Sequence, residues 1–192
     1  MPRPRNETGG SAAARPLRLF FALWPDPPLR AALAATAAAL RRSCGGRPPP
    51  ARNLHLTLAF LGEVAPSRLP ELVALAAGIP LRPFTLTLDR TGWWPRQRLV
   101  WAGARECPAE LEALAGKLAG ALRTAGFRSE HRPFVPHVTL LRDAQRAPPQ
   151  NPLQLPSWKV EGFVLACSGP SAHGVAYRIV GRSSTAGTGH GL

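Results

Sequence analysis

Hydrophobic and polar residues alternate along residues 52–64 with the period of two that is typical of a β-strand. One face carries Leu56, Leu58 and Phe60, and the other carries His55, Thr57 and Ala59. Gly62 lies near the end of this alternation and is expected to stop the strand. The pattern therefore predicts a strand that buries a leucine-rich face and presents an imidazole beside a hydroxyl on its other face.

The same arrangement recurs in residues 134–143, where His137 and Thr139 share one face and Val138 and Leu140 lie behind them. Two strands that each offer one imidazole and one hydroxyl are suited to a phosphate site, since both groups form hydrogen bonds with phosphate oxygens. The alternative interpretation is a pair of ordinary strand residues, with each histidine hydrogen-bonded at a sheet edge. We interpret the rest of the chain around these two motifs.

Residues 17–24 are expected to form the first strand, which ends at Pro25. Phe20 and Phe21 point to opposite faces of this strand, so one belongs to the core and the other can face a cleft. A helix follows, because Asp26 can cap its first turn and prolines are tolerated there. The residues at helical spacing are Leu29, Leu33, Ala37 and Leu40, and Gly45 and Gly46 end the helix.

The remaining elements are predicted from the same signals of spacing, alternation, proline and glycine. Helices are expected from Pro66 to Gly78 and from Pro108 to Gly126, and strands at residues 84–88, 98–102, 159–168 and 175–181. The last of these helices carries Leu111, Leu114, Leu118 and Leu122 on one side. Residues 84–102 are expected to form a hairpin whose long turn, residues 91–97, holds Trp93 and Trp94. Residues 147–156 are expected to form a proline-rich loop.

The predicted elements describe a duplicated architecture, in which each half ends in a helix followed by a histidine strand. Two half-units related by a pseudo-twofold axis would place the two histidine strands side by side at a central groove. We therefore expect an α+β fold of two pseudo-twofold-related lobes, with mostly antiparallel sheets facing a central cleft and helices packed outside. This domain is expected at residues 17–182, between a disordered leader (1–16) and a disordered tail (183–192).

The chain has 192 residues, which is enough for one domain or two small lobes with a hydrophobic core. Arg or Pro interrupts its hydrophobic stretches, so no membrane span is predicted, and the leader lacks the hydrophobic segment of a secretory signal. Cys44, Cys107 and Cys167 are odd in number and widely scattered, which predicts neither a disulfide framework nor a metal site. This use of cysteine fits a cytoplasmic protein.

The formal net charge of +13 allows two interpretations. One is an anionic partner, most naturally a nucleic acid. The other is compositional bias, because the chain is rich in Arg, Ala, Pro and Gly and contains almost no Lys. Charge alone therefore supports an RNA-type substrate without establishing one.

Four stretches of the chain carry a resemblance to a known family. They are LRLFFALW, NLHLTLAFLGEV, FTLTLDRTGWWPRQRLVWAG and RPFVPHVTLLRD. In them the chain resembles the two-histidine phosphoesterase superfamily, and within it the bacterial LigT/ThpR-like RNA 2′,3′-cyclic phosphodiesterases. The resemblance covers about residues 17–182 and includes both His-x-Thr motifs. It implies a two-lobed α+β fold, no metal or other cofactor, and a substrate that is RNA or a nucleotide ending in a 2′,3′-cyclic phosphate. A monomer is expected.

In that family the cyclic phosphate usually opens to a 2′-phosphate, which requires a base for water and an acid for the departing sugar oxygen. Imidazole suits both tasks, because its unperturbed pKa of about 6.5 leaves both protonation states accessible near neutral pH. By resemblance, His55 is the acid that protonates the 3′ oxygen, and His137 holds and activates the water. The motifs are nearly symmetric, so the residues themselves do not choose between these roles. Thr57 and Thr139 are expected to donate hydrogen bonds to the non-bridging oxygens.

Several other residues are weaker candidates for contact with substrate. Arg142 is either a phosphate contact or a surface arginine at a strand end, and Arg132 has the same two interpretations. The aromatic residues considered for stacking on a base are Phe20, Phe21, Trp94 and Trp101, with core packing as the alternative for each. The remaining histidines are His131 and His173, for which we expect surface or structural roles, and His190 in the tail.

Two other functions are compatible with the same residues. One is RNA end-joining (2′-5′ ligation), in which a 5′-hydroxyl attacks the cyclic phosphate in place of water. The other is a non-catalytic nucleotide- or RNA-binding module on the same fold. The paired histidines argue against this module, because a protein that only binds needs neither an acid nor a base.

Overall fold

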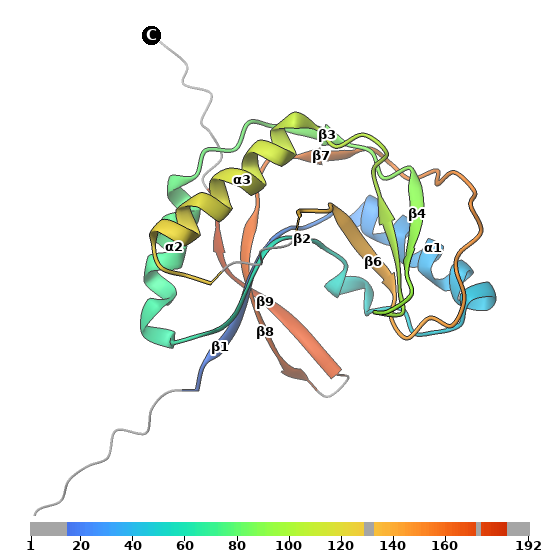
Figure 1. The fold of residues 1–192 in the computed structure, drawn as a ribbon, viewed down its shortest axis with the longest axis horizontal. Helices are drawn as coiled ribbons and strands as arrows, with labels where there is room; N and C mark the ends of the chain where they lie inside the picture. Colours follow the sequence, from blue (N-terminus) through green and yellow to red (C-terminus); the bar gives the residue numbers. More distant parts are fainter. Residues whose placement is uncertain (1–14, 129–132, 172–173, 184–192) are drawn as a thin grey trace, which may run out of the picture.

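An antiparallel sheet organises the chain, and a computed structural model describes residues 15–128, 133–171 and 174–183 (Figure 1). The strands are β1 Leu17–Leu23, β2 Leu56–Val64, β3 Phe84–Leu86, β4 Arg90–Trp94, β5 Leu99–Gly103, β6 His137–Leu141, β7 Trp158–Val160, β8 Val164–Ser171 and β9 Gly174–Arg182. The helices are α1 Pro27–Cys44, α2 Leu69–Gly78 and α3 Ala109–Thr124, with 3-10 turns η1 Ala51–Asn53 and η2 Pro66–Arg68. Seven strands form one sheet in the order β4-β5-β6-β2-β1-β8-β9, and β3 pairs separately with β7.

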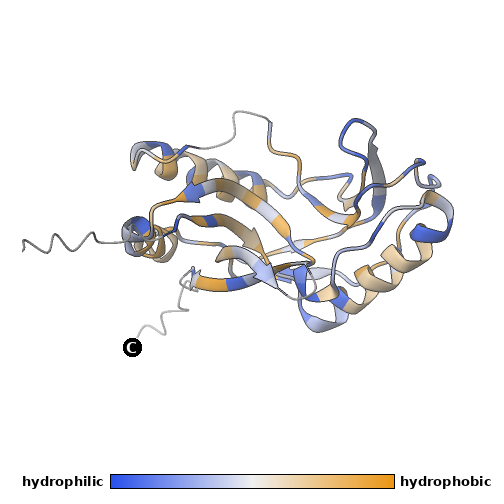
Figure 2. Cartoon of the chain, turned by 90° about the horizontal axis from the view of Figure 1, so that it is seen from below, coloured by the Kyte–Doolittle hydropathy of each residue, from blue (hydrophilic) through white to orange (hydrophobic). Residues whose placement is uncertain are grey.

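One face of the large sheet packs against the helices and forms the main hydrophobic core. The four leucines of α3 predicted to share one side are all buried there, together with the leucine-rich face of β2. Figure 1 shows α2 and α3 side by side, with α1 at the other end of the sheet, near β6. Figure 2 shows hydrophobic colour along the strands and much of α1, whereas many of the loops are hydrophilic. None of the described helices is long and apolar enough to span a membrane.

Helix α1 begins and ends where its capping residues predict. The Asp26 carboxylate accepts a hydrogen bond from the N–H of Leu29 at 2.9 Å, which satisfies a free donor of the first turn. Gly45 follows the last turn with a φ of 70°, and its N–H donates to the carbonyl of Arg41 at 2.9 Å. The buried residues Leu29, Leu33 and Ala37 face the core as their spacing predicts.

The predicted hairpin of residues 84–102 is wrong in its strand pairing. β3 pairs with β7, while the hairpin consists of β4 and β5, with Trp93 and Trp94 in β4 instead of in the turn. The turn is short, because the N–H of Arg98 donates to the carbonyl of Pro95 at 3.1 Å. Tryptophan favours strands, so both residues extend the ladder up to this tight turn.

Two other strand predictions are corrected at their boundaries. The strand expected at residues 159–168 is divided into β7 and β8, because Phe163 turns into the core at 1% exposure and its N–H donates to Ser183 Oγ. The break lets β7 pair with β3 while β8 pairs with β1. The first histidine strand begins at Leu56, since η1 precedes it, so His55 lies just before β2.

Phe60 lies on the face opposite to the one predicted. In β2 the residues Ala59 and Thr57 pair with consecutive residues of β1, which leaves Leu58 without an opposite residue, and a second irregularity follows near Phe60. A bulge of this kind places two residues against one and shifts the alternation of side chains. Phe60 therefore leaves the leucine-rich face and packs with Phe20 in a second, smaller hydrophobic cluster.

The histidine strands β2 and β6 are neighbours in the sheet, as predicted. In the described part of the chain a single Cα pair, Leu56 with Val138, joins the two strands. This narrow contact divides the large sheet into two parts, β4-β5-β6 and β2-β1-β8-β9. The α+β class with a mainly antiparallel sheet is confirmed. The pseudo-twofold lobes and the domain bounds stay predictions, and residues 1–14 of the leader and 184–192 of the tail lie outside the described residues.

Candidate active site

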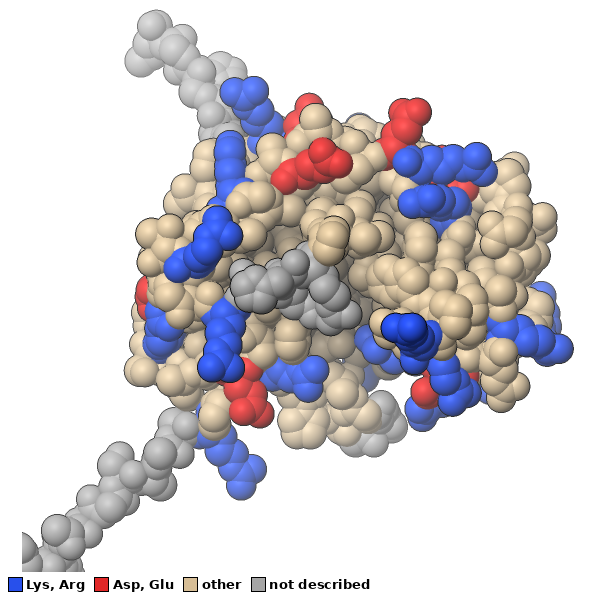
Figure 3. Space-filling view, in the orientation of Figure 1, with Lys and Arg blue, Asp and Glu red and all other residues tan. Residues whose placement is uncertain are grey.

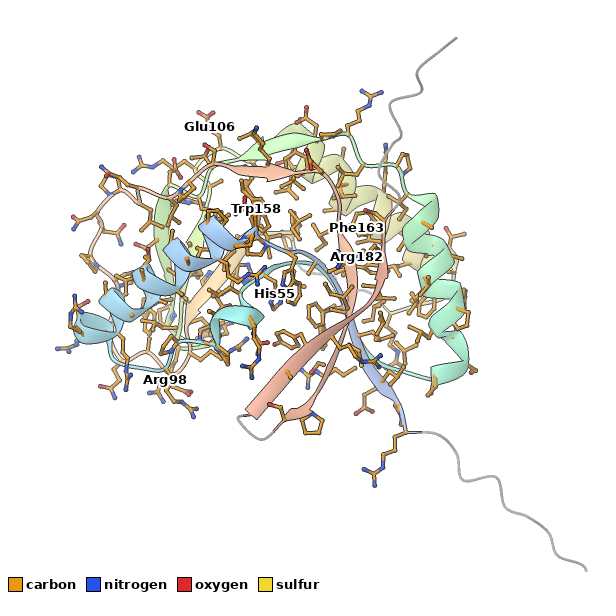
Figure 4. All side chains as sticks on the ribbon, turned by 180° about the vertical axis from the view of Figure 1, so that it is seen from behind. His55, Arg98, Glu106, Trp158, Phe163 and Arg182 are labelled. Atoms are coloured by element: carbon orange, nitrogen blue, oxygen red, sulfur yellow. The ribbon has the colours of Figure 1, made fainter. Side chains whose placement is uncertain are left out.

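A cleft of about 680 Å³ opens among side chains that turn away from the main core. Both motifs contribute to its lining through His55, Thr57, His137 and Thr139. The other lining residues are Arg18, Phe20, Arg47, Pro48, Pro49, Pro50, Asn53, Phe60, Leu99, Arg142, Ser168, Val175 and Tyr177. Figure 4 labels His55 near the centre of the view, and this residue is half-buried. The structure thus brings the two predicted triplets into one cavity.

Hydrogen bonds hold the His55 ring at both nitrogens. Its Nδ1 lies 2.6 Å from the backbone carbonyl oxygen of Asn53. A carbonyl oxygen only accepts, so Nδ1 carries a proton, and in the neutral ring Nε2 keeps a lone pair. Nε2 lies 3.1 Å from Oγ1 of Thr57, which therefore donates to it. The backbone thus selects the tautomer in which Nε2 is able to accept a proton.

Aromatic rings surround His55 on several sides. Trp24 stacks on it, with ring centroids 5.5 Å apart and an interplanar angle of 13°. Phe20 lies 4.9 Å away and Tyr177 lies 5.1 Å away, the latter edge-on. These rings restrict the orientation of the imidazole and exclude water from much of its surface.

The electrostatic environment of His55 favours its neutral form. Burial lowers the pKa of His55 to about 4, because the charged imidazolium loses water. The hydrogen bond to Asn53 opposes this shift, while the nearby charges of Arg142 and His137 add to it. In the free protein at pH 7 the His55 ring is therefore neutral.

His137 is held in a corresponding way in the second motif. Its Nδ1 lies 2.8 Å from the carbonyl oxygen of Val135, which makes Nδ1 a donor. The ring packs edge-on against Trp94 at 4.5 Å, and Trp101 lies 6.4 Å away. Each catalytic candidate thus donates its Nδ1 proton to the carbonyl two residues earlier, so the two motifs orient their imidazoles by the same local rule.

Because β2 and β6 are antiparallel, the two His-x-Thr motifs run in opposite directions on neighbouring strands. Their shared pair is Leu56 with Val138, and one step along the ladder in each direction reaches the motif residues. Counted outward from this pair in the antiparallel sense, His55 corresponds to Thr139 and Thr57 to His137. Imidazole and hydroxyl therefore alternate around one region of the cleft, where an anionic phosphate can be contacted from both strands.

Arg142 stands at the rim of the cleft, directly after β6. Its backbone N–H and carbonyl form hydrogen bonds of 2.9 and 2.8 Å with those of Arg47. Gly46 permits this approach, since a Cβ at that position would collide with the carbonyl oxygen of Arg142. Arg47 also pairs with Asp143 and lowers the pKa of that carboxyl group. Asp143 thus forms its ion pair with Arg47, and the Arg142 side chain lines the cleft.

The structure separates the weaker candidates. Phe20 lines the cleft, whereas Phe21 is fully buried in the main core. The alternation of β1 permits only one of these neighbours on each face. Trp101 is 8% exposed, packs against Trp94 and does not line the cleft. Candidates that lie outside the described residues are Arg132, His131, His173 and His190.

Motif reasoning missed several residues of the site. Asn53 supplies the carbonyl that orients His55, and Trp24 and Tyr177 cover the ring. The sequence offers only weak signals for these residues. Tyr177 is the sole tyrosine of the chain, and Asn53 lies two positions before His55. Their roles depend on the placement of β9 next to β8 and β1, which a sequence pattern does not reveal.

The charged side chains that line the cleft are cationic, namely Arg18, Arg47 and Arg142. Figure 3 shows Lys and Arg spread around the edges of the visible face, with fewer acidic residues among them. In the described residues no group of three or more His, Cys, Asp or Glu is placed to hold a metal ion. The local chemistry is therefore that of imidazoles, hydroxyls and guanidinium groups around an anion.

Two His-x-Thr motifs that meet on neighbouring strands in a basic cleft define a two-histidine phosphoesterase site. The family model described as LigT like Phosphoesterase matches residues 23–101 and 103–177. The chain belongs to this LigT-like phosphoesterase family.

Relatives and solved structures agree with this assignment. The chain is 45% identical to the RNA 2′,3′-cyclic phosphodiesterase of Escherichia coli strain K12 over 134 residues, which cover 70% of this chain and 76% of that protein. Identity to the Thermus thermophilus protein of the same name is 34% over 181 residues, 89% of this chain and 91% of the relative. The structure of E. coli LigT complexed with 3′-AMP has a TM-score of 0.81 at 40% identity, covering 87% of this chain and 97% of that chain.

Proposed function

We propose that this chain hydrolyses the 2′,3′-cyclic phosphate end of RNA or of a nucleotide to a 2′-phosphate, without a metal ion. The observation that carries the proposal is the convergence of His55 and His137 in one cleft, each with its Nδ1 bound to a backbone carbonyl. Relatives named RNA 2′,3′-cyclic phosphodiesterase support the substrate class. The structure of E. coli LigT complexed with 3′-AMP supports a nucleotide as ligand.

In the proposed reaction a water oxygen attacks phosphorus and the bond from phosphorus to the 3′ oxygen breaks. Nε2 of His137 accepts the proton of the water, and Nε2 of His55 delivers a proton to the departing 3′ oxygen. Because the free His55 is neutral, it must first gain this proton. A bound phosphate favours that step, since a nearby negative charge raises the pKa of an imidazole.

The other cleft residues have supporting roles in this proposal. When Nε2 of His55 carries a proton, the Thr57 hydroxyl no longer donates to that nitrogen and can turn to a non-bridging oxygen. The Thr139 hydroxyl donates to a non-bridging oxygen as well, where negative charge develops. Arg142 contacts the phosphate from the rim, and Phe60 and Tyr177, the half-buried rings that pack with Phe20, are available to the base. We further propose that the protein is a cytoplasmic monomer, in keeping with its free Cys44, Cys107 and Cys167.

The direct test is turnover of 2′,3′-cyclic AMP, with the product isomer identified by phosphorus NMR. We expect adenosine 2′-phosphate, formed at the same rate with and without a chelator. His55→Ala and His137→Ala should each reduce kcat by about 10²–10⁴-fold, the usual contribution of a general acid or base. Thermal unfolding of each variant provides the control that the fold is retained.

Thr57→Val and Thr139→Val give a graded comparison, since each removes one hydroxyl and keeps the strand shape. We expect smaller losses of kcat than for the histidine variants. Near wild-type turnover after loss of either histidine would reject the mechanism, and an adenosine 3′-phosphate product would reject the assignment of the leaving oxygen.

A further inference from the structure

Besides the histidines, the cleft is lined by two residues of β1, Phe20 and Arg18. Arg18 and Phe20 lie two residues apart on β1, so their side chains share one face of the strand. They pair with Ser168 and Ala166 of β8, and Ser168 also lines the cleft. Phe20 in turn contacts His55, with ring centroids 4.9 Å apart. A continuous surface therefore leads from the catalytic imidazole, over an aromatic ring, to a guanidinium group.

The Arg18 side chain is available for an anion. Its opposite residue in β2 is Glu63, yet in the described part of the chain the two side chains form no ion pair. The guanidinium carbon instead lies 5.0 Å from the centre of the Phe60 ring, a cation–π arrangement. This contact does not use the N–H donors of Arg18, which are left for a ligand.

Aromatic side chains lie near both His55 and Arg18. Phe20, Phe60 and Tyr177 pack in one cluster, and all three line the cleft. Rings of this kind offer a surface for a nucleoside, because base and aromatic faces stack with little regard to sequence. On a strand, the step from Phe20 to Arg18 is about 6–7 Å, which is comparable with the spacing of successive phosphates in an RNA strand.

We propose that the Arg18 end of the cleft is a subsite for the phosphodiester on the 5′ side of the terminal nucleotide. This inference rests on the proposed function, because the cyclic phosphate is taken to lie between His55 and His137. The terminal nucleoside then lies over the aromatic cluster, and its 5′ phosphate reaches Arg18. The subsite favours an RNA chain over a mononucleotide as substrate.

The test compares three substrates: 2′,3′-cyclic AMP, the same nucleotide with a 5′-phosphate, and the dinucleotide ApA with a 2′,3′-cyclic end. For the wild-type protein we expect kcat/KM to be about tenfold higher for the dinucleotide than for cyclic AMP, as for one charge-assisted hydrogen bond. Arg18→Gln should remove this preference, lowering kcat/KM for the dinucleotide by about tenfold and that for cyclic AMP much less. Arg18→Lys should keep part of it, because the charge remains. The 5′-phosphorylated mononucleotide measures how much of the gain comes from the phosphate alone.

Arg82→Gln is the matched control, since Arg82 is exposed and lies in a second cavity beside α3, outside the cleft. It removes the same charge and should change no substrate ratio. An Arg18→Gln protein that keeps the preference for the dinucleotide, or loses activity equally on all three substrates, would overturn the subsite. Absence of turnover of every substrate by the wild-type protein would instead overturn the proposed function, so the two failures are distinguishable.

Discussion

The most unusual single residue is His55, an imidazole enclosed by Trp24, Phe20 and Tyr177. Enclosure lowers its pKa from 6.5 to about 4. The unfolded chain therefore binds a proton at this residue before the folded protein does. A group that accepts its proton late in the folded state makes folding less favourable as the solution becomes acidic.

The first prediction concerns stability against pH. The contribution of His55 is absent above pH 6.5, grows as the pH falls from 6.5 towards 4, and is constant below that. Over this window it should lower the free energy of unfolding by roughly 3 kcal/mol. Urea unfolding of the wild type and of His55→Asn between pH 7 and pH 4 measures it, since the variant should lose less stability on acidification. Equal slopes for the two proteins would contradict the buried neutral state.

His137→Asn in the same series separates the neighbouring imidazole from the effect of burial. The charge of His137 is a smaller cause of the His55 shift than burial is. We therefore expect His137→Asn to leave most of the pH dependence in place.

At the residue scale, much of the site could be predicted from the sequence, because alternation alone places His55 with Thr57 and His137 with Thr139. Alternation also requires Phe20 and Phe21 to lie on opposite faces, but it does not determine which of them faces the cleft. That choice depends on the helices that cover one side of the sheet. Phe60 was placed wrongly because a bulge depends on the pairing partner and leaves no clear mark in the strand itself.

At the scale of elements, the β4–β5 hairpin supports the second motif. Gly92 of β4 lies opposite Trp101 of β5, and the indole ring occupies the space that a side chain at Gly92 would need. Trp101 in turn packs against Trp94, and both rings lie next to His137. The absence of a Cβ at Gly92 thus makes room for the Trp101 ring that packs beside His137, one of the two proposed catalytic residues.

We predict that Gly92→Ala displaces Trp101 and lowers stability by about 1–3 kcal/mol, as overpacking does. It should also lower kcat on 2′,3′-cyclic AMP, because His137 loses its support. Urea unfolding and steady-state kinetics measure the two effects. Retention of both the unfolding midpoint and kcat would show that the hairpin does not position His137.

Gly116→Ala is the matched control for this change. Gly116 lies inside α3, and a Cβ there would meet no atom within 4 Å. The substitution should raise stability by about 0.5–1 kcal/mol, because alanine favours a helix over glycine. Activity should not change, since α3 lies on the other side of the sheet from the cleft.

Elements with strong local signals are those that the sequence predicts well. α1 has a capping aspartate and two terminal glycines, and α3 has four leucines at helical spacing. The pairing of β3 with β7 joins distant parts of the chain. No tight turn connects these two strands, so no turn signal in the sequence indicates that they pair. Local pattern therefore predicts helices and isolated strands, whereas the choice of partner strand is a property of the assembled sheet.

At the scale of the whole molecule, the formal net charge of +13 has two sequence interpretations, and only one affects binding. The cationic side chains that line the cleft favour the anionic-partner interpretation for at least part of the charge. We predict that kcat/KM for an RNA oligonucleotide with a 2′,3′-cyclic end falls steeply between about 50 and 300 mM salt. The value for 2′,3′-cyclic AMP should change much less, because it carries one phosphate. Equal salt dependence for the two substrates would favour compositional bias.

The contact between β2 and β6 has a consequence for the occupied protein. The residues proposed to grip the phosphate stand on either side of the Leu56–Val138 pair. A substrate that binds residues of both strands links the two parts of the sheet across their narrowest contact. Binding should therefore stabilise the folded sheet. The protein should therefore be stiffest while it holds the phosphate and loosest just after product departs.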